Sequence, residues 1–249
     1  MPVAGKIVLI TGAARGLGFE YARALGAAGA HVVAGDIADC APAAAAAGNG
    51  AIGVRLDVTD LRSAEAMAEA ALGAFGRIDA LINNAALYGS LRGGRFTAIP
   101  DADWDAAMAV NVKGIWHCCK AVVGAMRAAG GGSIVNVASL AATYGMPYAL
   151  HYTTSKAAVI GMTRGLAREL GRDNIRVNAL APSAVMTEGT QEFFGDKLDR
   201  ALETIRTGQA LQRTLVPADL TGTVAWLISD ESRFVTGQTI AVDGGTVML

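Results

Sequence analysis

Tyr152 and Lys156 stand four residues apart in the stretch HYTTSK, residues 151–156. On a helix, positions i and i+4 lie on the same face, so the phenol would lie beside the ammonium. A phenol titrates near ~10, and a neighbouring positive charge lowers that pKa. Two unit charges ~4 Å apart at an effective dielectric of ~20 interact by roughly 4 kcal/mol, or about three pKa units. The spacing predicts a proton-transfer pair; the alternative for so short a motif is a tyrosine packed on an amphipathic helix beside an extended lysine.

The rest of the chain alternates short apolar runs with longer helical patterns. Near-continuous apolar strands separated by helices are typical of a parallel sheet that is covered on both faces. The expected strands are residues 6–11, 31–36, 51–58, 78–83, 133–139, 175–181 and 239–243. The expected helices are residues 16–29, 60–75, 103–128, 151–171 and 217–229, with a short one after Pro42 that ends at Gly48. We therefore predict a single α/β domain over 1–249, with a Rossmann-type, doubly wound, seven-stranded parallel sheet and helices on both faces.

One segment interrupts the alternation. Residues 183–214 form a stretch of about thirty residues without an expected strand, and they follow the carboxyl end of the sixth strand. Ligands bind at this edge of open α/β sheets, and long connections there are frequently functional. We expect this segment to be a substrate lid.

A glycine-rich turn, TGAARGLG, lies between the first strand and the first helix. Its glycines at positions 12, 16 and 18 allow backbone amides to approach a pyrophosphate at a helix N-terminus. The second strand ends on Asp36, the position at which a carboxylate accepts hydrogen bonds from the ribose of a dinucleotide. The turn therefore predicts a nicotinamide dinucleotide site.

Asp36 and Arg15 make opposite predictions about the adenosine ribose. A carboxylate at position 36 would repel a 2′-phosphate by several kcal/mol, on the order expected for charges in contact. Arg15 could pair with that phosphate, whereas Ile37 offers no such pairing. We predict NAD rather than NADP.

The order of these motifs resembles the short-chain dehydrogenase/reductase family over essentially the whole chain. The matching residues are Thr11-Gly12-x-x-x-Gly16-x-Gly18, Asp57, Asn83-Asn84-Ala85, Asn111, Ser139, Tyr152-x-x-x-Lys156 and Pro182-x-x-x-x-Thr187. The chain departs from the family pattern at Ala86 and Ser183, which replace glycines beside the nicotinamide. These two positions put the local loop geometry in doubt.

The resemblance implies an enzyme with four catalytic residues. Tyr152 would exchange a proton with the substrate hydroxyl, and Lys156 would lower the pKa of the phenol and bind the nicotinamide ribose. Ser139 would hold the substrate oxygen, and Asn111 would anchor a water relay behind Lys156.

The cofactor contacts follow from the glycine turn and from the resemblance. Asp57 and Val58 would bind the adenine, and Thr187 would bind the nicotinamide amide. The expected cofactor residues are Gly12, Arg15, Gly16, Leu17, Gly18, Asp36, Ile37, Asp57, Val58, Asn84, Ala85, Ala86, Tyr152, Lys156, Pro182, Ser183, Val185 and Thr187.

The candidate substrate residues are mostly apolar. They are Tyr88, Leu140, Tyr144, Met146, Met186 and Phe193, with Leu87 and Phe194 beside them. We therefore expect hydride transfer between NAD(H) and an apolar secondary alcohol or ketone. The alternatives are a 3-oxoacyl-carrier-protein reductase and, in another class, a non-catalytic NAD sensor or scaffold.

Composition limits the partners. The formal net charge of −1 without a basic block argues against nucleic acid, and no segment approaches the ~20 apolar residues of a membrane span. The four apolar residues after Lys6 are too few for a signal-peptide core, so we expect a cytoplasmic protein. The three cysteines and three histidines show no metal-ligand spacing, which predicts no metal and buried, reduced thiols. The resemblance implies a homotetramer built through the helices near 103–128 and 151–171. The apolar ending VDGGTVML suits burial at an interface, and the sequence by itself fits a dimer as well as a tetramer.

Overall fold

The computed structural model describes residues 3–248 and places seven parallel strands in one sheet. The strand order is β3-β2-β1-β4-β5-β6-β7, so the chain starts near the centre and winds outwards in both directions. The strands are β1 (Ile7–Thr11), β2 (His31–Asp36), β3 (Ile52–Arg55), β4 (Ala80–Asn83), β5 (Gly132–Val137), β6 (Ile175–Pro182) and β7 (Thr239–Val242). This is the doubly wound sheet that the apolar runs predict.

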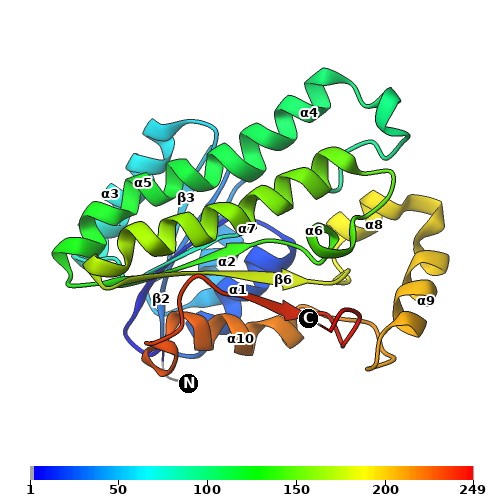
Figure 1. Cartoon of the computed structure of the whole chain (residues 1–249). Coiled ribbons are helices and arrows are strands. Elements are labelled where there is room, and N and C mark those ends of the chain that lie inside the picture. The colour runs from blue at the N-terminus through cyan, green and yellow to red at the C-terminus, as the bar shows by residue number, and fades with distance from the viewer. Residues whose placement is uncertain (1–2, 249) are drawn as a thin grey trace.

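Helices cover both faces of the sheet, as expected (Figure 1). On one face lie α1 (Gly16–Ala27), α2 (Ala41–Ala47) and α10 (Ala218–Ile228). On the other lie α3 (Leu61–Phe75), α5 (Gly114–Ala128) and α7 (Leu150–Leu170). Each set buries a separate apolar core against its face, and the sheet is thereby shielded from water on both sides.

The helix expected over 103–128 differs from the prediction. It consists of α4 (Asp101–Met108), a π-helical turn η2 (Ala109–Lys113) and α5, which follow one another without a break. A π-turn inserts an extra residue into a helix and is frequently found at functional sites. Here the turn contains Asn111, whose side chain bonds outside the helix, as described below.

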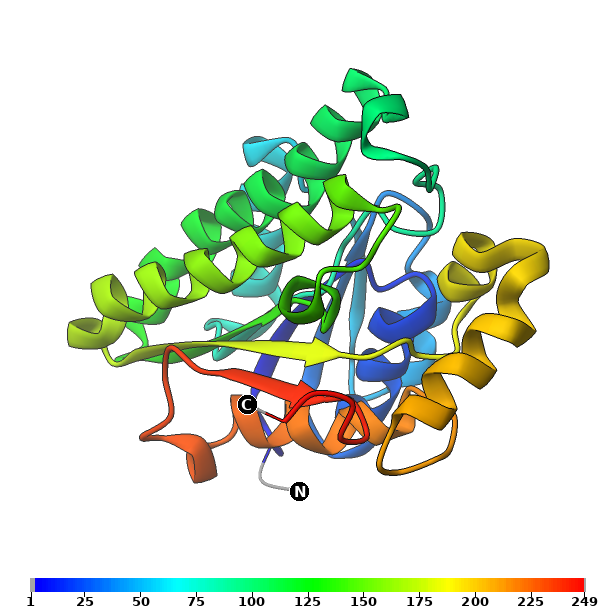
Figure 2. The same ribbon diagram turned by 45° about the vertical axis from the view of Figure 1, so that its right-hand side comes forward.

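The segment after β6 is helical. It contains α8 (Glu188–Phe194), the 3₁₀ turn η4 (Gly195–Lys197) and α9 (Leu198–Gly208), and an isolated parallel bridge between Val185 and Leu215 joins its two ends. Figure 2 shows α8 and α9 beyond the carboxyl end of β6. The remaining short elements are η1 (Phe96–Ala98), α6 (Ala141–Tyr144), η3 (Gly171–Asp173) and η5 (Asp230–Ser232).

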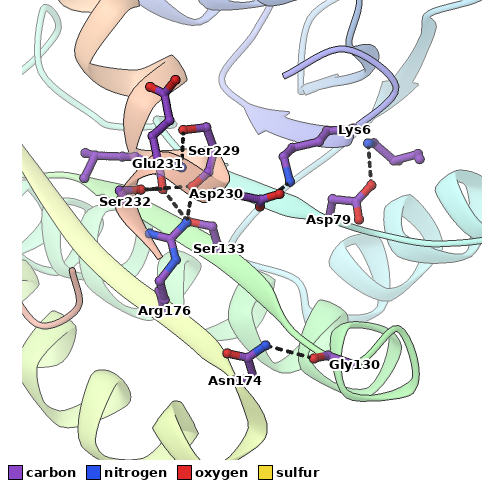
Figure 3. A network of polar contacts seen from close by, with 12 residues as sticks. Lys6, Asp79, Gly130, Ser133, Asn174, Arg176, Ser229, Asp230, Glu231 and Ser232 are labelled. Atoms are coloured by element: carbon purple, nitrogen blue, oxygen red, sulfur yellow. Dashed lines mark hydrogen bonds and ion pairs between the residues drawn. The ribbon is translucent and has the colours of Figure 1, made fainter. Parts of the chain in front are cut away.

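Polar contacts join the opposite, amino-terminal edge of the sheet (Figure 3). A carboxylate oxygen of Asp79 accepts the backbone N–H of Ile7 at 2.8 Å, which links the starts of β4 and β1. The hydroxyl of Ser133 donates to the carbonyl of Leu227 at 2.8 Å, and Arg176 donates to the backbone that follows α10. These contacts satisfy a strand N–H at Ile7 and carbonyls at the end of α10.

Within residues 3–248, no helix combines the length and the apolar character needed to cross a bilayer. Cys40, Cys118 and Cys119 are buried and unpaired, as the sequence predicts.

We expect Asp79→Ala to lower the free energy of unfolding by about 1–3 kcal/mol, because it leaves the buried N–H of Ile7 without its acceptor. Urea unfolding followed by circular dichroism measures this loss. The control is Asp173→Ala, which breaks a surface ion pair with Arg127 and should cost less than about 1 kcal/mol. Equal losses in the two variants would contradict the assigned role of Asp79.

Candidate active site

A cavity of about 740 Å³ follows the carboxyl-terminal edge of the sheet. Open α/β sheets bind ligands in this crevice, because all parallel strands end there. It brings together most of the predicted residues: Gly12, Arg15, Gly16, Leu17, Asp36, Ile37, Asp57, Val58, Asn84, Ala85, Ala86, Tyr88, Ser139, Leu140, Tyr144, Met146, Tyr152, Lys156, Pro182, Ser183, Val185 and Thr187.

Four predicted residues lie outside the cavity wall. Gly18 lies beneath the glycine turn, where a Cβ would come within 2.0 Å of the Gly12 carbonyl oxygen. Asn111 is buried behind the wall. Phe193 stacks on Tyr88, with ring centroids 4.6 Å apart, while the next residue of α8 lines the cavity in its place.

Met186 is the fourth, and its backbone N–H donates to Leu215 at the base of the helical segment. Neighbouring residues of a helix or an extended segment point in different directions, and a list of apolar residues does not tell which of them faces inward. Met186 and Phe193 are therefore not wall residues.

The sequence reasoning missed several wall residues that adjoin predicted ones. They belong to no motif of their own, and the last three come from the helical segment after β6: Ala14, Ala38, Thr59, Gly89, Ser90, Val110, Val137, Glu188, Thr190 and Ile205.

The glycine turn is joined tightly to the loop after β4. Thr11 Oγ1 accepts the backbone N–H groups of Asn84 at 3.0 Å and Ala85 at 2.9 Å. The Asn84 amide donates back to the carbonyls of Thr11 and Gly12. Gly12 has φ +67°, and a Cβ there would lie 2.7 Å from the Ala85 Cα, so this approach requires glycine.

The N-terminus of α1 opens into the cavity beside this turn. Its N-cap, Arg15, makes no side-chain capping hydrogen bond, and the first backbone N–H groups of the helix are free to bind an anion. The glycine cradle and the free amides fit the pyrophosphate of a dinucleotide.

Asp36 lies at one end of the cavity with both carboxylate oxygens oriented by backbone. One oxygen accepts the N–H of Ala14 and the other that of Ala38, each at 3.1 Å. A carboxylate offers about four acceptor positions, so both oxygens can still accept ribose hydroxyls. Ile37 beside it is 62% exposed and provides no cation.

Asp57 stabilises the turn that follows it in the chain. One carboxylate oxygen accepts the N–H of Thr59 at 2.9 Å and its hydroxyl at 2.7 Å, and these hydrogen bonds lower the pKa of Asp57. The turn that it holds presents Val58 to the cavity, and the imidazole of His117 lies 3.1 Å from the Val58 carbonyl.

Tyr152 and Lys156 are buried at the other end of the cavity, side by side on α7. The Lys156 Nζ lies 5.8 Å from the centre of the tyrosine ring and donates to the Val137 carbonyl at 2.7 Å. Burial lowers the pKa of Lys156 to about 8 and raises the pKa of Tyr152 to about 12; hydrogen bonding with Ser139 partly offsets the rise.

The expectation that Lys156 lowers the pKa of Tyr152 towards neutrality is therefore wrong in direction, because the pKa of Tyr152 is raised. Burial disfavours the charged form of each group, and it is the largest cause of both pKa shifts.

Ser139 follows β5 and lies partly buried in the wall. Its hydroxyl oxygen accepts the backbone N–H of Ala141 at 3.1 Å, so the hydroxyl hydrogen can be donated to a neighbouring oxygen, that of Tyr152 or of a substrate.

Asn111 connects the π-turn to α7, the helix that carries Tyr152 and Lys156. Its side-chain oxygen accepts the N–H of Leu87 at 2.7 Å, and its amide donates to the Leu87 carbonyl at 3.1 Å and to the Ser155 hydroxyl at 3.0 Å. Ser155 donates in turn to the carbonyl of Tyr152 at 2.7 Å. The side chain of Asn111 thus holds the loop after β4 against the helix that carries the tyrosine.

Comparison with known proteins decides what kind of site this is. The sequence profile of the enoyl-(acyl carrier protein) reductase family matches residues 12–247. An uncharacterised oxidoreductase of Mycobacterium tuberculosis is 43% identical over 98% of both chains. A 3-oxoacyl-[acyl-carrier-protein] reductase of Thermotoga maritima is 39% identical over the full length of both chains.

A solved structure agrees with these sequence matches. The 3-ketoacyl-(acyl-carrier-protein) reductase of Brucella melitensis, in complex with NADH, superposes with a TM-score of 0.91 at 31% identity. The match covers 99% of this chain and 100% of the reductase chain. The chain belongs to the short-chain dehydrogenase/reductase family. It is an oxidoreductase of the kind that acts on CH–OH and C=O groups.

Ala86 and Ser183, which replace glycines of the family pattern, cause no backbone strain in this short-chain dehydrogenase. Among the described non-glycine residues, positive φ is confined to Asn49, Tyr148 and Asn174. Neither Ala86 nor Ser183 needs the left-handed region, so a side chain is tolerated at both positions. Thr187, expected at the nicotinamide amide, also caps α8 by accepting the N–H of Thr190 at 3.3 Å.

The buried Lys156 predicts a pH-dependent stability for this dehydrogenase. Between pH 8 and 10.5 the folded lysine is neutral while the unfolded one still binds a proton, because burial lowers its pKa from 10.5 to about 8. The unfolded state then binds more protons, so stability rises with pH through this window. Relative to Lys156→Met, the wild type should gain on the order of 1–2 kcal/mol from pH 7 to 9.5 in urea unfolding.

The control is Lys197→Met, because Lys197 is exposed on the helical segment and should show no such trend. A constant difference between wild type and Lys156→Met across this range would mean that the lysine stays charged when folded.

Proposed function

We propose that this protein transfers a hydride between NAD(H) and a mainly apolar secondary alcohol or ketone. Tyr152 is the general acid/base, with Lys156, Ser139 and Asn111 in support. The observation that carries this proposal is the position of Tyr152, Lys156 and Ser139 in one buried end of the cavity, with Asp36 in the same wall at the other end.

Proton handling follows from the hydrogen bonds of each group. Ser139 already accepts one backbone N–H, and it donates its own hydrogen to the substrate oxygen. Tyr152, neutral at physiological pH because burial raises its pKa to about 12, gives its proton to that oxygen when a carbonyl is reduced.

The opposite direction requires a phenolate. The ammonium of Lys156 lies 5.8 Å from the ring centre, and a unit charge at ~6 Å stabilises an anion by about 3 kcal/mol at an effective dielectric of ~20. One of its three N–H groups bonds Val137, and the other two remain for the nicotinamide ribose and a water molecule.

NAD is the proposed cofactor. The glycine cradle, the open N-terminus of α1 and the oriented Asp36 carboxylate fit a dinucleotide with a free 2′-hydroxyl. When bound, the nicotinamide supplies the hydride chemistry, and the protein supplies orientation and proton transfer. The NADH complex of the Brucella melitensis reductase supports this choice.

The substrate end of the cavity supports an apolar substrate. Its wall includes Tyr88, Leu140, Tyr144 and Met146, and the lining cations of the cavity are Arg15 and Lys156. We propose that residues 183–214 act as the lid of a single domain, because α8 and α9 contribute Phe194 and Ile205 to the same wall.

A 3-oxoacyl-carrier-protein reductase is the second candidate. The Thermotoga maritima relative of that name is 39% identical over the whole chain and favours it. The reaction is the same in kind but acts on a thioester-linked chain, so the substrate alone distinguishes the two.

We also propose a cytoplasmic homotetramer. Trp116 on α5, at 44% exposure, and Phe234, whose side chain is fully exposed, are apolar groups that a subunit interface would cover.

The test is NADH formation by the purified protein with a panel of secondary alcohols, each run with NAD and with NADP. The panel includes aryl carbinols, hydroxysteroids, sugar alcohols and 3-hydroxyacyl thioesters. We expect turnover of an apolar alcohol with NAD. Preference for NADP and 3-hydroxyacyl thioesters would establish the carrier-protein reductase, and NAD binding without turnover would favour a sensor.

Tyr152→Phe is the control variant for this assay. It should reduce turnover by about 10²- to 10⁴-fold, because the reaction loses its general acid/base, while NADH affinity changes little. Near-normal turnover in this variant would refute the assignment of Tyr152.

A further inference from the structure

Arg15 and Glu192 form an ion pair between the glycine turn and the lid. The guanidinium donates to both carboxylate oxygens, with Nη1–Oε1 at 2.5 Å and Nη2–Oε2 at 3.1 Å. The two residues are 177 positions apart in sequence. A bidentate pair of this kind fixes the plane of the guanidinium as well as its position.

The surroundings of Glu192 leave room for this pair. A Cβ at Gly89 would lie 2.4 Å from Glu192 Oε2 and 3.0 Å from its Cβ. The loop after β4 thus has a glycine where the glutamate crosses towards Arg15. Any side chain at position 89 would displace the carboxylate.

Arg15 is the cation of the described cavity wall that lies on the same side as Asp36. Of the two cations in the described cavity wall, Lys156 lies on the catalytic helix, and Arg15 lies on the turn beside Asp36. Glu192 makes the largest contribution to raising the pKa of Arg15, and Glu188 and Asp36 add to it. Arg55 does not line the cavity. Its guanidinium is held by the Ile37 carbonyl, to which it donates at 2.9 Å.

We propose that Glu192 is a second determinant of the NAD preference, because it holds Arg15 on the lid and away from the adenosine ribose. A 2′-phosphate adds up to two negative charges beside the Asp36 carboxylate, and Arg15 is the wall cation that can compensate them. Because both terminal nitrogens of the Arg15 guanidinium bond Glu192, Arg15 must break this pair to reach the phosphate. The inference rests on the NAD site proposed above.

The alternative is that the Arg15–Glu192 pair only holds the lid closed and has no effect on cofactor specificity. Loosening the lid changes the affinity for NADH and NADPH by the same factor, since the two differ by the 2′-phosphate alone. Releasing Arg15 improves NADPH binding selectively. The ratio of the two affinities therefore separates the two roles.

The experiment measures NADH and NADPH binding by cofactor fluorescence in the full chain. In Glu192→Gln we expect NADPH to bind about two- to fivefold more tightly, the upper part of the range for removing an exposed ion pair, and NADH affinity to change by less than about 1.5-fold. The double variant Arg15→Gln/Glu192→Gln should lose this gain. Glu203→Gln is the matched control, because it breaks an exposed pair with Arg206 within α9 and should leave the ratio unchanged.

An unchanged affinity ratio in Glu192→Gln, or equal changes for both cofactors, would overturn the inference while the wild type still prefers NADH. A wild type that binds NADPH as tightly as NADH would overturn the proposed NAD preference itself, and the inference with it.

Discussion

The common direction of the seven strands is the constraint on which the site depends. Because every strand runs parallel, the turn after β1, Asp36 at the end of β2, the loop after β4 and Ser139 after β5 all reach the same edge. Hydrogen bonds from Asn84 and Ala85 to Thr11 then draw two of these loops together across the strand pair β1–β4. The cavity is a consequence of the topology, and the loops determine its chemistry.

Burial controls the ionisation of Tyr152 and Lys156 at that edge. It raises the pKa of Tyr152 to about 12 and lowers that of Lys156 to about 8. Burying the Lys156 ammonium with one carbonyl partner costs folding free energy, because the charge loses its hydration; a lysine on the surface would keep its hydration. The position of Lys156 in the site is explained by the charge it places near the tyrosine and by the donors that it keeps free. The Asn111 side chain and the π-turn complete this arrangement by attaching the catalytic helix to the loop after β4.

Most of the fold and much of the candidate site could be predicted from local sequence. Apolar runs located the seven strands, and the glycine turn with Asp36 located the nucleotide end of the cavity. Other features depend on contacts that leave no local pattern. The π-turn contains Asn111, which bonds Leu87 across the fold, and the orientation of Phe193 depends on how α8 packs on Tyr88. The pKa of Tyr152 was mispredicted because spacing shows a neighbouring charge but not the depth of burial.

The central claim is direct hydride transfer between a substrate carbinol carbon and the nicotinamide ring. The most direct test uses a secondary alcohol that the protein oxidises, deuterated at the carbinol carbon, with unlabelled NAD and NMR of the reduced cofactor. The account predicts deuterium at one face of the nicotinamide C4 together with a slower hydride-transfer step. Reduced cofactor without deuterium at C4 would contradict it.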